Sequence, residues 1–276
     1  MFKIFRKYKI KGIYLFAFIV IFLVILMALF PAIFTRIDPN KILGKSLLRP
    51  SSQYLFGTDD IGRDIFSRTI YGTRNTLYVG LGSSILAALF GIPLGLISGY
   101  FGGKIDLIIM RILDALMSFP AMLFAVLIIA VTGANASSLV FAIAVINFPR
   151  FSRIVRSSTL SVKKIDFVLA TKTFGAKTNY LLFNTILRNC LSPIVVQFTL
   201  LVATAILIEA SMSFIGLGIQ PPDPAWGSML YVAQLYIRKA WWFAFIPGFM
   251  IFIVVYSFNL FGDWLRDFTD PKKRTS

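Results

Sequence analysis

Charged residues are scarce in this sequence, since only 14% of its 276 residues are Asp, Glu, Lys or Arg, whereas 57% are hydrophobic. Soluble domains usually carry about one quarter charged residues, so a soluble fold could not bury this much apolar surface. The apolar residues also form long blocks without charge, a pattern that suits contact with lipid. The composition therefore predicts an integral membrane protein with a single membrane domain.

Histidine is absent, and cysteine occurs once, at Cys190. A disulfide within the chain is thereby excluded, and a metal site built from Cys and His is not expected. No GxxxxGK motif followed by Ser or Thr occurs either, so the chain lacks that means of holding nucleotide phosphates. We therefore expect no catalytic or metal site, and we expect any energy source to lie in another subunit.

The positive charge does not indicate a nucleic-acid partner, although the formal net charge is +16. Lys and Arg lie between the apolar blocks, where they orient helices by the positive-inside rule. No basic stretch alternates with aromatic residues as it does on nucleic-acid-binding surfaces. Membrane lipid is therefore the expected surrounding.

Apolar runs of about 20 residues, enough to cross a membrane, occupy residues 13–34, 76–101, 190–214 and 240–262. The uncharged stretch 119–149 is divided by a TGANASS turn at 132–138, so its halves need residues from their flanks. One helix then begins near Ile105, and the other runs from Leu139 into the following basic segment. An all-α protein with about six transmembrane helices results.

Finer features of these two added helices also follow from the sequence. Pro120 and Pro149 should kink them, and Arg111 should pair with Asp114, three residues further on the same helical face. The even number of spans puts both termini on one side of the membrane. Lys and Arg number 19 on that side and 9 on the other, so both termini are expected to be cytoplasmic.

The long external connection before the second span is expected to contain a short amphipathic helix. Asp59 or Asp60 is a suitable N-cap, and an apolar stripe follows at Ile61, Ile65, Phe66 and Ile70. Such a helix can lie on the membrane surface. It would serve as a structural collar before the span or contact the solute directly.

The long cytoplasmic connection is expected to contain a second short helix, at 167–174. Asp166 can cap its start, and Gly175 can end it in the left-handed conformation. Phe167, Ala170 and Phe174 share one face, which therefore is apolar. A helix outside the membrane with an exposed apolar stripe usually needs a partner; the alternative is packing on helix ends of the same chain.

Five segments in fixed order carry a family resemblance: FGTDDIGRDIFSR at 56–68, GYFGGKIDLIIMRILDALMSFP at 99–120, DFVLATKTFGA at 166–176, SFIGLGIQPPDPAWGSML at 213–230 and NLFGDWLRDFTDP at 259–271. With them the chain resembles the inner-membrane permeases of binding-protein-dependent ABC importers. The similarity is to the DppC-like subunit type of the dipeptide, oligopeptide and nickel branch. It covers the chain from about Tyr54 to Pro271.

The resemblance implies the type I importer permease fold in the bacterial cytoplasmic membrane. Residues 1–75 would form the N-terminal helix and the external loop with its amphipathic helix, and residues 76–276 the core transmembrane domain. The connection 150–189 would hold the coupling loop, which inserts into a groove on a cytoplasmic ATPase. The residues expected to couple to the ATPase are Asp166, Phe167, Ala170, Lys172, Phe174, Gly175 and Ala176.

The resemblance also implies the partners. They are a second permease subunit in a heterodimer, two ABC ATPase subunits that carry ATP and Mg²⁺, and an external solute-binding protein; this chain itself would bind no cofactor. Two external segments are candidates for docking the binding protein, with the residues Asp59, Asp60, Arg63, Asp64, Asp223 and Trp226. Trp226, in a proline-stiffened loop, also suits the aromatic belt at the membrane interface.

Glu209 lies late in the fifth predicted span, close to Ser213. Acidic groups in membrane segments are functional candidates by default, so contact with the solute or a role in gating is one hypothesis for this pair. A structural hydrogen-bonding role near the external interface is the other.

The expected function is that of a permease subunit in an ATP-driven importer of di- or oligopeptides. Import of nickel or a metal chelate is the alternative within the same family. An ion-coupled secondary carrier is a weaker alternative, because such carriers place ionisable groups or broken helices at the bilayer midplane. The predicted spans are nearly free of charge.

Overall fold

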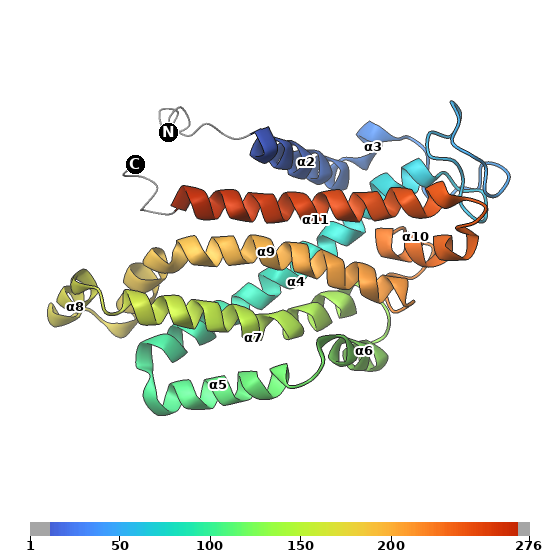
Figure 1. Ribbon diagram of the computed structural model, residues 1–276. Coiled ribbons are helices and arrows are strands. Elements are labelled where there is room, and N and C mark those ends of the chain that lie inside the picture. The colour runs from blue at the N-terminus through green and yellow to red at the C-terminus, as the bar shows by residue number, and fades with distance from the viewer. Residues whose placement is uncertain (1–11, 270–276) are drawn as a thin grey trace. The chain divides into compact units, whose positions relative to one another are not determined.

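The computed structural model describes residues 12–269, which are almost entirely helical (Figure 1). That part of the chain contains no β-strand, only two isolated bridges. The elements are α2 (Gly12–Leu29), α3 (Pro31–Phe34), α4 (Ile65–Phe101), α5 (Gly103–Met117), α6 (Ala121–Thr132), α7 (Ala136–Val162), α8 (Asp166–Thr173), η1 (Tyr180–Ile186), α9 (Leu187–Phe214), α10 (Trp226–Ala233), η2 (Gln234–Tyr236) and α11 (Trp241–Thr269).

Five of the described helices are long and apolar enough to cross a membrane, and a sixth span results if α5 and α6 are taken together. The prediction of an all-α membrane protein with about six spans is confirmed. Each of the four clear apolar runs lies mostly in one of these helices, because a backbone in lipid must pair its polar groups internally. The run 13–34 continues past the end of α2 into the short helix α3. The basic end segments 1–11 and 270–276, which enter the charge count, lie outside the described residues.

The chain divides into two compact units. The first contains the described residues of Met1–Leu77 together with Ala210–Trp264. Its core includes Ile65, Met229 and Trp242. Within this unit α2 packs on α11, where the ring of Phe18 meets the ring of Trp264 edge-on with centroids 4.9 Å apart.

The second unit contains Tyr78–Glu209 and the described residues that follow Trp264. Its core clusters around Phe151 and Val155 of α7. Glycines recur every fourth residue along α4, at positions 91, 95 and 99, and all three contact α7. A Cβ atom added at Gly95 would lie 2.5 Å from the carbonyl oxygen of Ser152. The two backbones therefore approach as closely as in the small-residue interfaces typical of membrane helices.

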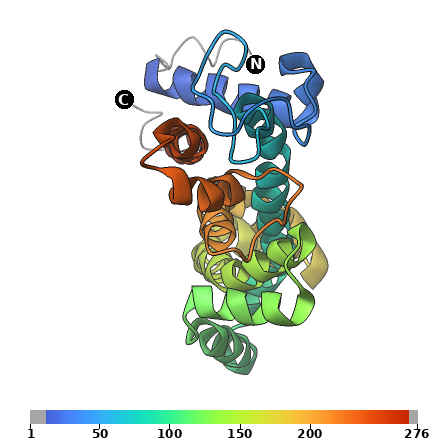
Figure 2. The ribbon, with the colours of Figure 1, turned by 90° about the vertical axis from the view of Figure 1, so that its right-hand side faces the viewer.

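The third predicted span is broken rather than kinked. Helices α5 and α6 are bent by 84° at residues 118–120, and Figure 2 shows them crossing at a large angle. Pro120 is the N-cap residue of α6, with ψ 123°. Proline lacks an N–H donor and disfavours helical geometry in the residue before it, which accounts for the break. Pro149, in contrast, lies inside the continuous helix α7.

The predicted amphipathic surface helix is wrong. Helix α4 begins at Ile65 and continues for 37 residues into the second span, and Ile65 and Ile70 are buried. Asp64, not Asp59 or Asp60, caps it, because its Oδ2 accepts the N–H of Ser67 at 2.8 Å. The apolar stripe is the first part of a longer buried face, which its local spacing alone does not reveal.

Candidate functional site

Helix α8 (Asp166–Thr173) forms the predicted helix of the cytoplasmic connection. Its N-cap residue is Ile165, and no side chain makes a capping hydrogen bond, so the predicted capping role of Asp166 is wrong. Asp166 lies instead in the first turn, where its carboxylate interacts favourably with the positive end of the helix dipole.

The end of α8 has the predicted left-handed glycine, because Gly175 has φ +79°. Its N–H donates to the carbonyl of Lys172 at 3.0 Å, and the N–H of Ala176 donates to the carbonyl of Thr171 at 3.4 Å. These two bonds form a Schellman motif. Gly175 and Ala176 thus stop the helix sharply and turn the chain towards η1.

The two faces of α8 have different environments. Val168 is buried in the core of its unit together with Leu182 and Ile186. On the other side, Phe167 is 44% exposed and Phe174 is 91% exposed. The alternative that this stripe packs on helix ends of the same chain is therefore wrong for Phe174. Burying such a side chain would contribute about 1.5–3 kcal/mol, so the exposed face suits a partner surface.

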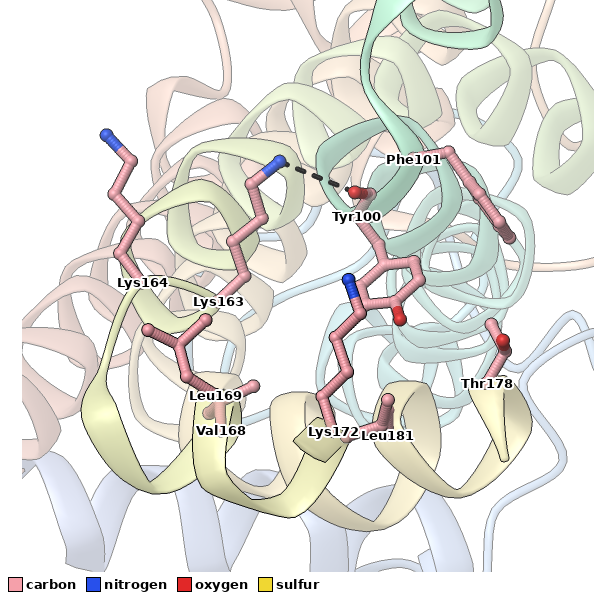
Figure 3. Close-up of a pocket in the computed structure, with 9 residues that line it drawn as sticks. All are labelled: Tyr100, Phe101, Lys163, Lys164, Val168, Leu169, Lys172, Thr178 and Leu181. Atoms are coloured by element: carbon pink, nitrogen blue, oxygen red, sulfur yellow. Dashed lines mark hydrogen bonds between the residues drawn. The ribbon is translucent and has the colours of Figure 1, made fainter. Parts of the chain in front are cut away.

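A cavity of about 630 Å³ lies beside α8, lined also by the ends of α4 and α7 (Figure 3). Lys163 and Lys172 extend towards Tyr100 from two sides, whereas the ammonium group of Lys164 points away. The Nζ atom of Lys163 donates to the carbonyl of Gly99 at 2.7 Å. The last carbonyl groups of a helix lack partners within the helix, and Lys163 supplies a donor to one of them at the end of α4. This bond fixes the end of α7 to the end of α4.

Ion pairs join α5 to α7 in the same unit. Arg156 Nε donates to Asp106 Oδ1 at 2.6 Å, and Ser98 also donates to this carboxylate. Asp114 pairs with Arg153, so the predicted Arg111–Asp114 pair is wrong. Arg153 of α7 pairs with Asp114 in place of Arg111, the residue three positions earlier on the same helix. The pair of Asp114 with Arg153 is half-exposed and contributes little stability, whereas the pair of Asp106 with Arg156 is less exposed. Together the two pairs set the position of α5 along α7.

The external acidic segment forms a compact ionic cluster. Asp59 is fully buried, accepts Arg63 Nε at 2.6 Å and lies 3.6 Å from Arg68 Nε. Burial, assisted by the neighbouring Asp59, raises the pKa of Asp60 above its ordinary value. Asp64 is also buried. In this chain these residues shape the external connection; Arg63 and Asp60 keep partial exposure, and contact with a binding protein stays a prediction.

Arg68 was not predicted, yet it joins three segments of the first unit. It is 4% exposed, and its Nη1 donates to Pro39 O, Asn40 Oδ1 and Pro222 O at 3.1, 3.2 and 3.4 Å. An arginine four residues into an apolar helix was the available signal, because such a charge requires partners when buried.

The loop before α10 places its two candidate residues differently. Asp223 is exposed, whereas Trp226 is fully buried and its Nε1 donates to the carbonyl of Thr69 at 3.0 Å. The prediction that Trp226 belongs to an interfacial belt is therefore wrong. Its indole fills the core of the first unit, where it finds both apolar contact and a hydrogen-bond acceptor.

Glu209 and Ser213 are both buried, at 0% and 1% exposure. A Cβ atom at Gly227 would lie 2.6 Å from the Cβ of Ser213, so Ser213 packs closely on α10. A solute or gating role for the pair stays a prediction. Within residues 12–269, no three His, Cys, Asp or Glu side chains group closely enough to hold a metal ion.

Solved structures show the same fold. The MetNI methionine ABC transporter in an inward-facing conformation superposes with a TM-score of 0.62 and 19% identity, covering 73% of this chain and 96% of its own. An amino acid ABC transporter gives a TM-score of 0.55 at 15% identity, covering 72% of this chain and 92% of its own.

Curated relatives match nearly the whole chain. The dipeptide transport system permease protein DppC of Alkalihalophilus pseudofirmus is 42% identical over 98% of this chain and 90% of its own length. The probable D,D-dipeptide permease DdpC of Escherichia coli is 40% identical over 92% and 86%. The glutathione permease GsiD of Pectobacterium atrosepticum is 42% identical over 82% and 75%.

A family model, the binding-protein-dependent transport system inner membrane component, matches residues 91–275, which include the broken span, α8 and the last helix. Together with the near-complete relatives, this match shows that the chain belongs to the family of binding-protein-dependent transport system inner membrane components.

Proposed function

We propose that this chain is the permease subunit of an ATP-driven importer that moves dipeptides or similar short peptides across the bacterial cytoplasmic membrane. The observation that carries the proposal is the 42% identity over 98% of the chain to a dipeptide permease. Other relatives are named for D,D-dipeptides and for glutathione, which is itself a tripeptide. A peptide is thus the solute class that these names share.

Energy would reach this chain through α8. The exposed side chains of Phe167 and Phe174 offer an apolar surface to a cytoplasmic ATPase, while Val168 anchors the helix in the core of its unit. A helix held on one face and exposed on the other can transmit a movement of the ATPase to the spans. Two ATPase subunits with ATP and Mg²⁺, a second permease subunit in a heterodimer and an external binding protein would complete the transporter. Residues 76–276 would form the transport core.

The test is reconstitution of the complete transporter in proteoliposomes. We expect uptake of a radiolabelled dipeptide that requires internal ATP and external binding protein, and we expect no ATP hydrolysis by this chain alone. Liposomes that lack this chain but contain the other subunits are the control. Uptake of a nickel chelate without uptake of dipeptide would contradict the peptide assignment and favour the metal alternative.

A further inference from the structure

A second cavity, of about 300 Å³, lies at the break between α5 and α6 in the second compact unit. Its lining comes from four helices and includes Met117, Pro120, Phe124, Asn147, Arg150 and Thr204. It contains none of the residues that the sequence singled out as site candidates. Small-molecule sites usually have volumes of about 300–1,000 Å³, so this cavity suits one end of a small solute.

Asn147 is the unusual residue of this cavity. It is 2% exposed, and its Nδ2 has no hydrogen-bond partner among the described residues. It lies roughly 16 Å from Ala136, the first residue of α7, along a helix of roughly 40 Å, so it is near the middle of this helix. Burying an unpaired amide donor is costly. A buried polar group within a membrane-spanning helix is a functional candidate.

Further donors surround the same cavity. The start of α6 contributes its N-cap residue Pro120 and the helical residues Ala121 and Phe124 to the lining, and no side chain caps the start of this helix. The N–H groups of a helix's first turn lack partners within the helix and carry the positive end of the dipole. Arg150 adds a full positive charge, one turn after Asn147 on the same helix.

The chemistry of this lining selects an anion. A guanidinium, an amide N–H group and a helix N-terminus are all donors, and no Asp or Glu lines the cavity. Broken membrane helices commonly direct such half-helix N-termini at the anionic group of a transported solute. The terminal carboxylate is the anionic group that every short peptide has, and arginine binds it with two parallel hydrogen bonds.

We propose that this cavity is a solute-contact site in the transport path, where Arg150, Asn147 and the first turn of α6 bind the carboxylate end of a transported peptide. This inference rests on the proposed function. It explains why the third span is broken at Pro120 and why an amide is buried in an otherwise apolar run of α7.

The test uses the complete transporter in proteoliposomes, with saturating binding protein and a radiolabelled alanine dipeptide. For Arg150→Gln and Asn147→Leu we expect dipeptide uptake at least about tenfold below that of the wild type, a factor that corresponds to about 1.4 kcal/mol. ATP hydrolysis stimulated by the binding protein should stay within about twofold, because the face of α8 exposed at Phe174 is untouched. Arg150→Lys should give intermediate uptake, because it keeps the charge and loses the paired hydrogen bonds. Arg111→Gln is the matched control, since Arg111 is exposed and does not line the cavity.

A direct measurement of occupancy uses Thr204→Cys in a Cys190→Ser background, because Thr204 lines the cavity but is not one of the proposed carboxylate contacts. Excess dipeptide should slow the reaction of this thiol with a small reagent, and should not slow the reaction at Arg111→Cys. Unchanged uptake, equal losses of uptake and ATP hydrolysis, no protection by dipeptide, or loss of the second permease subunit from the purified variants would each overturn the proposal. If the wild-type transporter imports no dipeptide at all, the proposed function itself fails, which is a distinguishable result.

Discussion

Single residues decide how closely the helices of the second unit pack. Gly91, Gly95 and Gly99 leave room for the backbone of α7, and Gly95 is the tightest of the three, because even one methyl group would meet the Ser152 carbonyl oxygen. A backbone oxygen cannot move aside as a flexible side chain can. A glycine elsewhere on α4 need not have this role. At Gly82, an added Cβ would meet only the end of the Val140 side chain, at 3.3 Å.

We predict that Gly95→Ala lowers the unfolding free energy of the purified chain by about 1–3 kcal/mol, the usual cost of overpacking. Gly82→Ala should be neutral or stabilising, because alanine favours a helix over glycine by about 1 kcal/mol. Both variants gain this helix propensity, so the difference between their unfolding free energies isolates the effect of packing at Gly95. Unfolding in detergent, followed by circular dichroism, measures it. Equal stability of the two variants would show that α4 and α7 do not depend on close contact at Gly95.

Single residues also differ in how well the sequence predicts their positions. Gly175 was predicted correctly, because a positive φ at a helix end strongly favours glycine. The position of Trp226 was not, since an interfacial tryptophan and a core tryptophan with a hydrogen-bond acceptor have the same local sequence. Asn147 was not predicted, although a lone amide that interrupts an apolar run is a signal of a buried polar site within a span.

At the scale of the element, α8 is held on one face and free on the other. Val168 is buried, and Phe174 is almost fully exposed. A charge at position 174 would therefore leave the fold of this chain unaffected. In a complex it would place an unpaired charge in a buried contact, which costs about 3–5 kcal/mol, or roughly two to four orders of magnitude in affinity.

We predict that Phe174→Glu inserts normally into the membrane but loses the co-purifying ATPase and the uptake of dipeptide. Lys172→Glu, whose side chain lines the cavity beside Tyr100, should have a milder effect. Affinity purification of the transporter followed by quantification of bound ATPase distinguishes the two. An intact complex with near-normal uptake in Phe174→Glu would show that α8 does not dock the ATPase through this face.

Elements were predictable where one local property determines them. The spans follow from uninterrupted apolar runs, and α8 follows from its apolar stripe between Asp166 and a terminating glycine. The prediction of a surface helix was wrong because Ile65 and Ile70 are buried. Ile65 packs against residues that are distant in the sequence, such as Met229 and Trp242. The ion pair of Asp114 with Arg153 likewise depends on contact between helices that no local spacing reveals.

At the scale of the whole molecule, orientation in the membrane determines which partner each face of the protein can meet. The excess of Lys and Arg on the side of the termini puts the connection that carries α8 in the cytoplasm. That side is where an ATPase meets its ATP, so the charge distribution and the proposed coupling role agree. The acidic cluster around Asp59 then lies outside, where a binding protein would approach.

We predict that a cysteine introduced at Lys45 is external and one at Lys177 is cytoplasmic. Both lysines are exposed, whereas the natural thiol of Cys190 is buried and should contribute little labelling. A membrane-impermeant maleimide added to right-side-out vesicles should therefore label Lys45→Cys and spare Lys177→Cys. In inverted vesicles the pattern should be reversed, because the same reagent then reaches the cytoplasmic face. Labelling of Lys177→Cys in right-side-out vesicles would invert the orientation, and with it α8 would face away from any cytoplasmic ATPase.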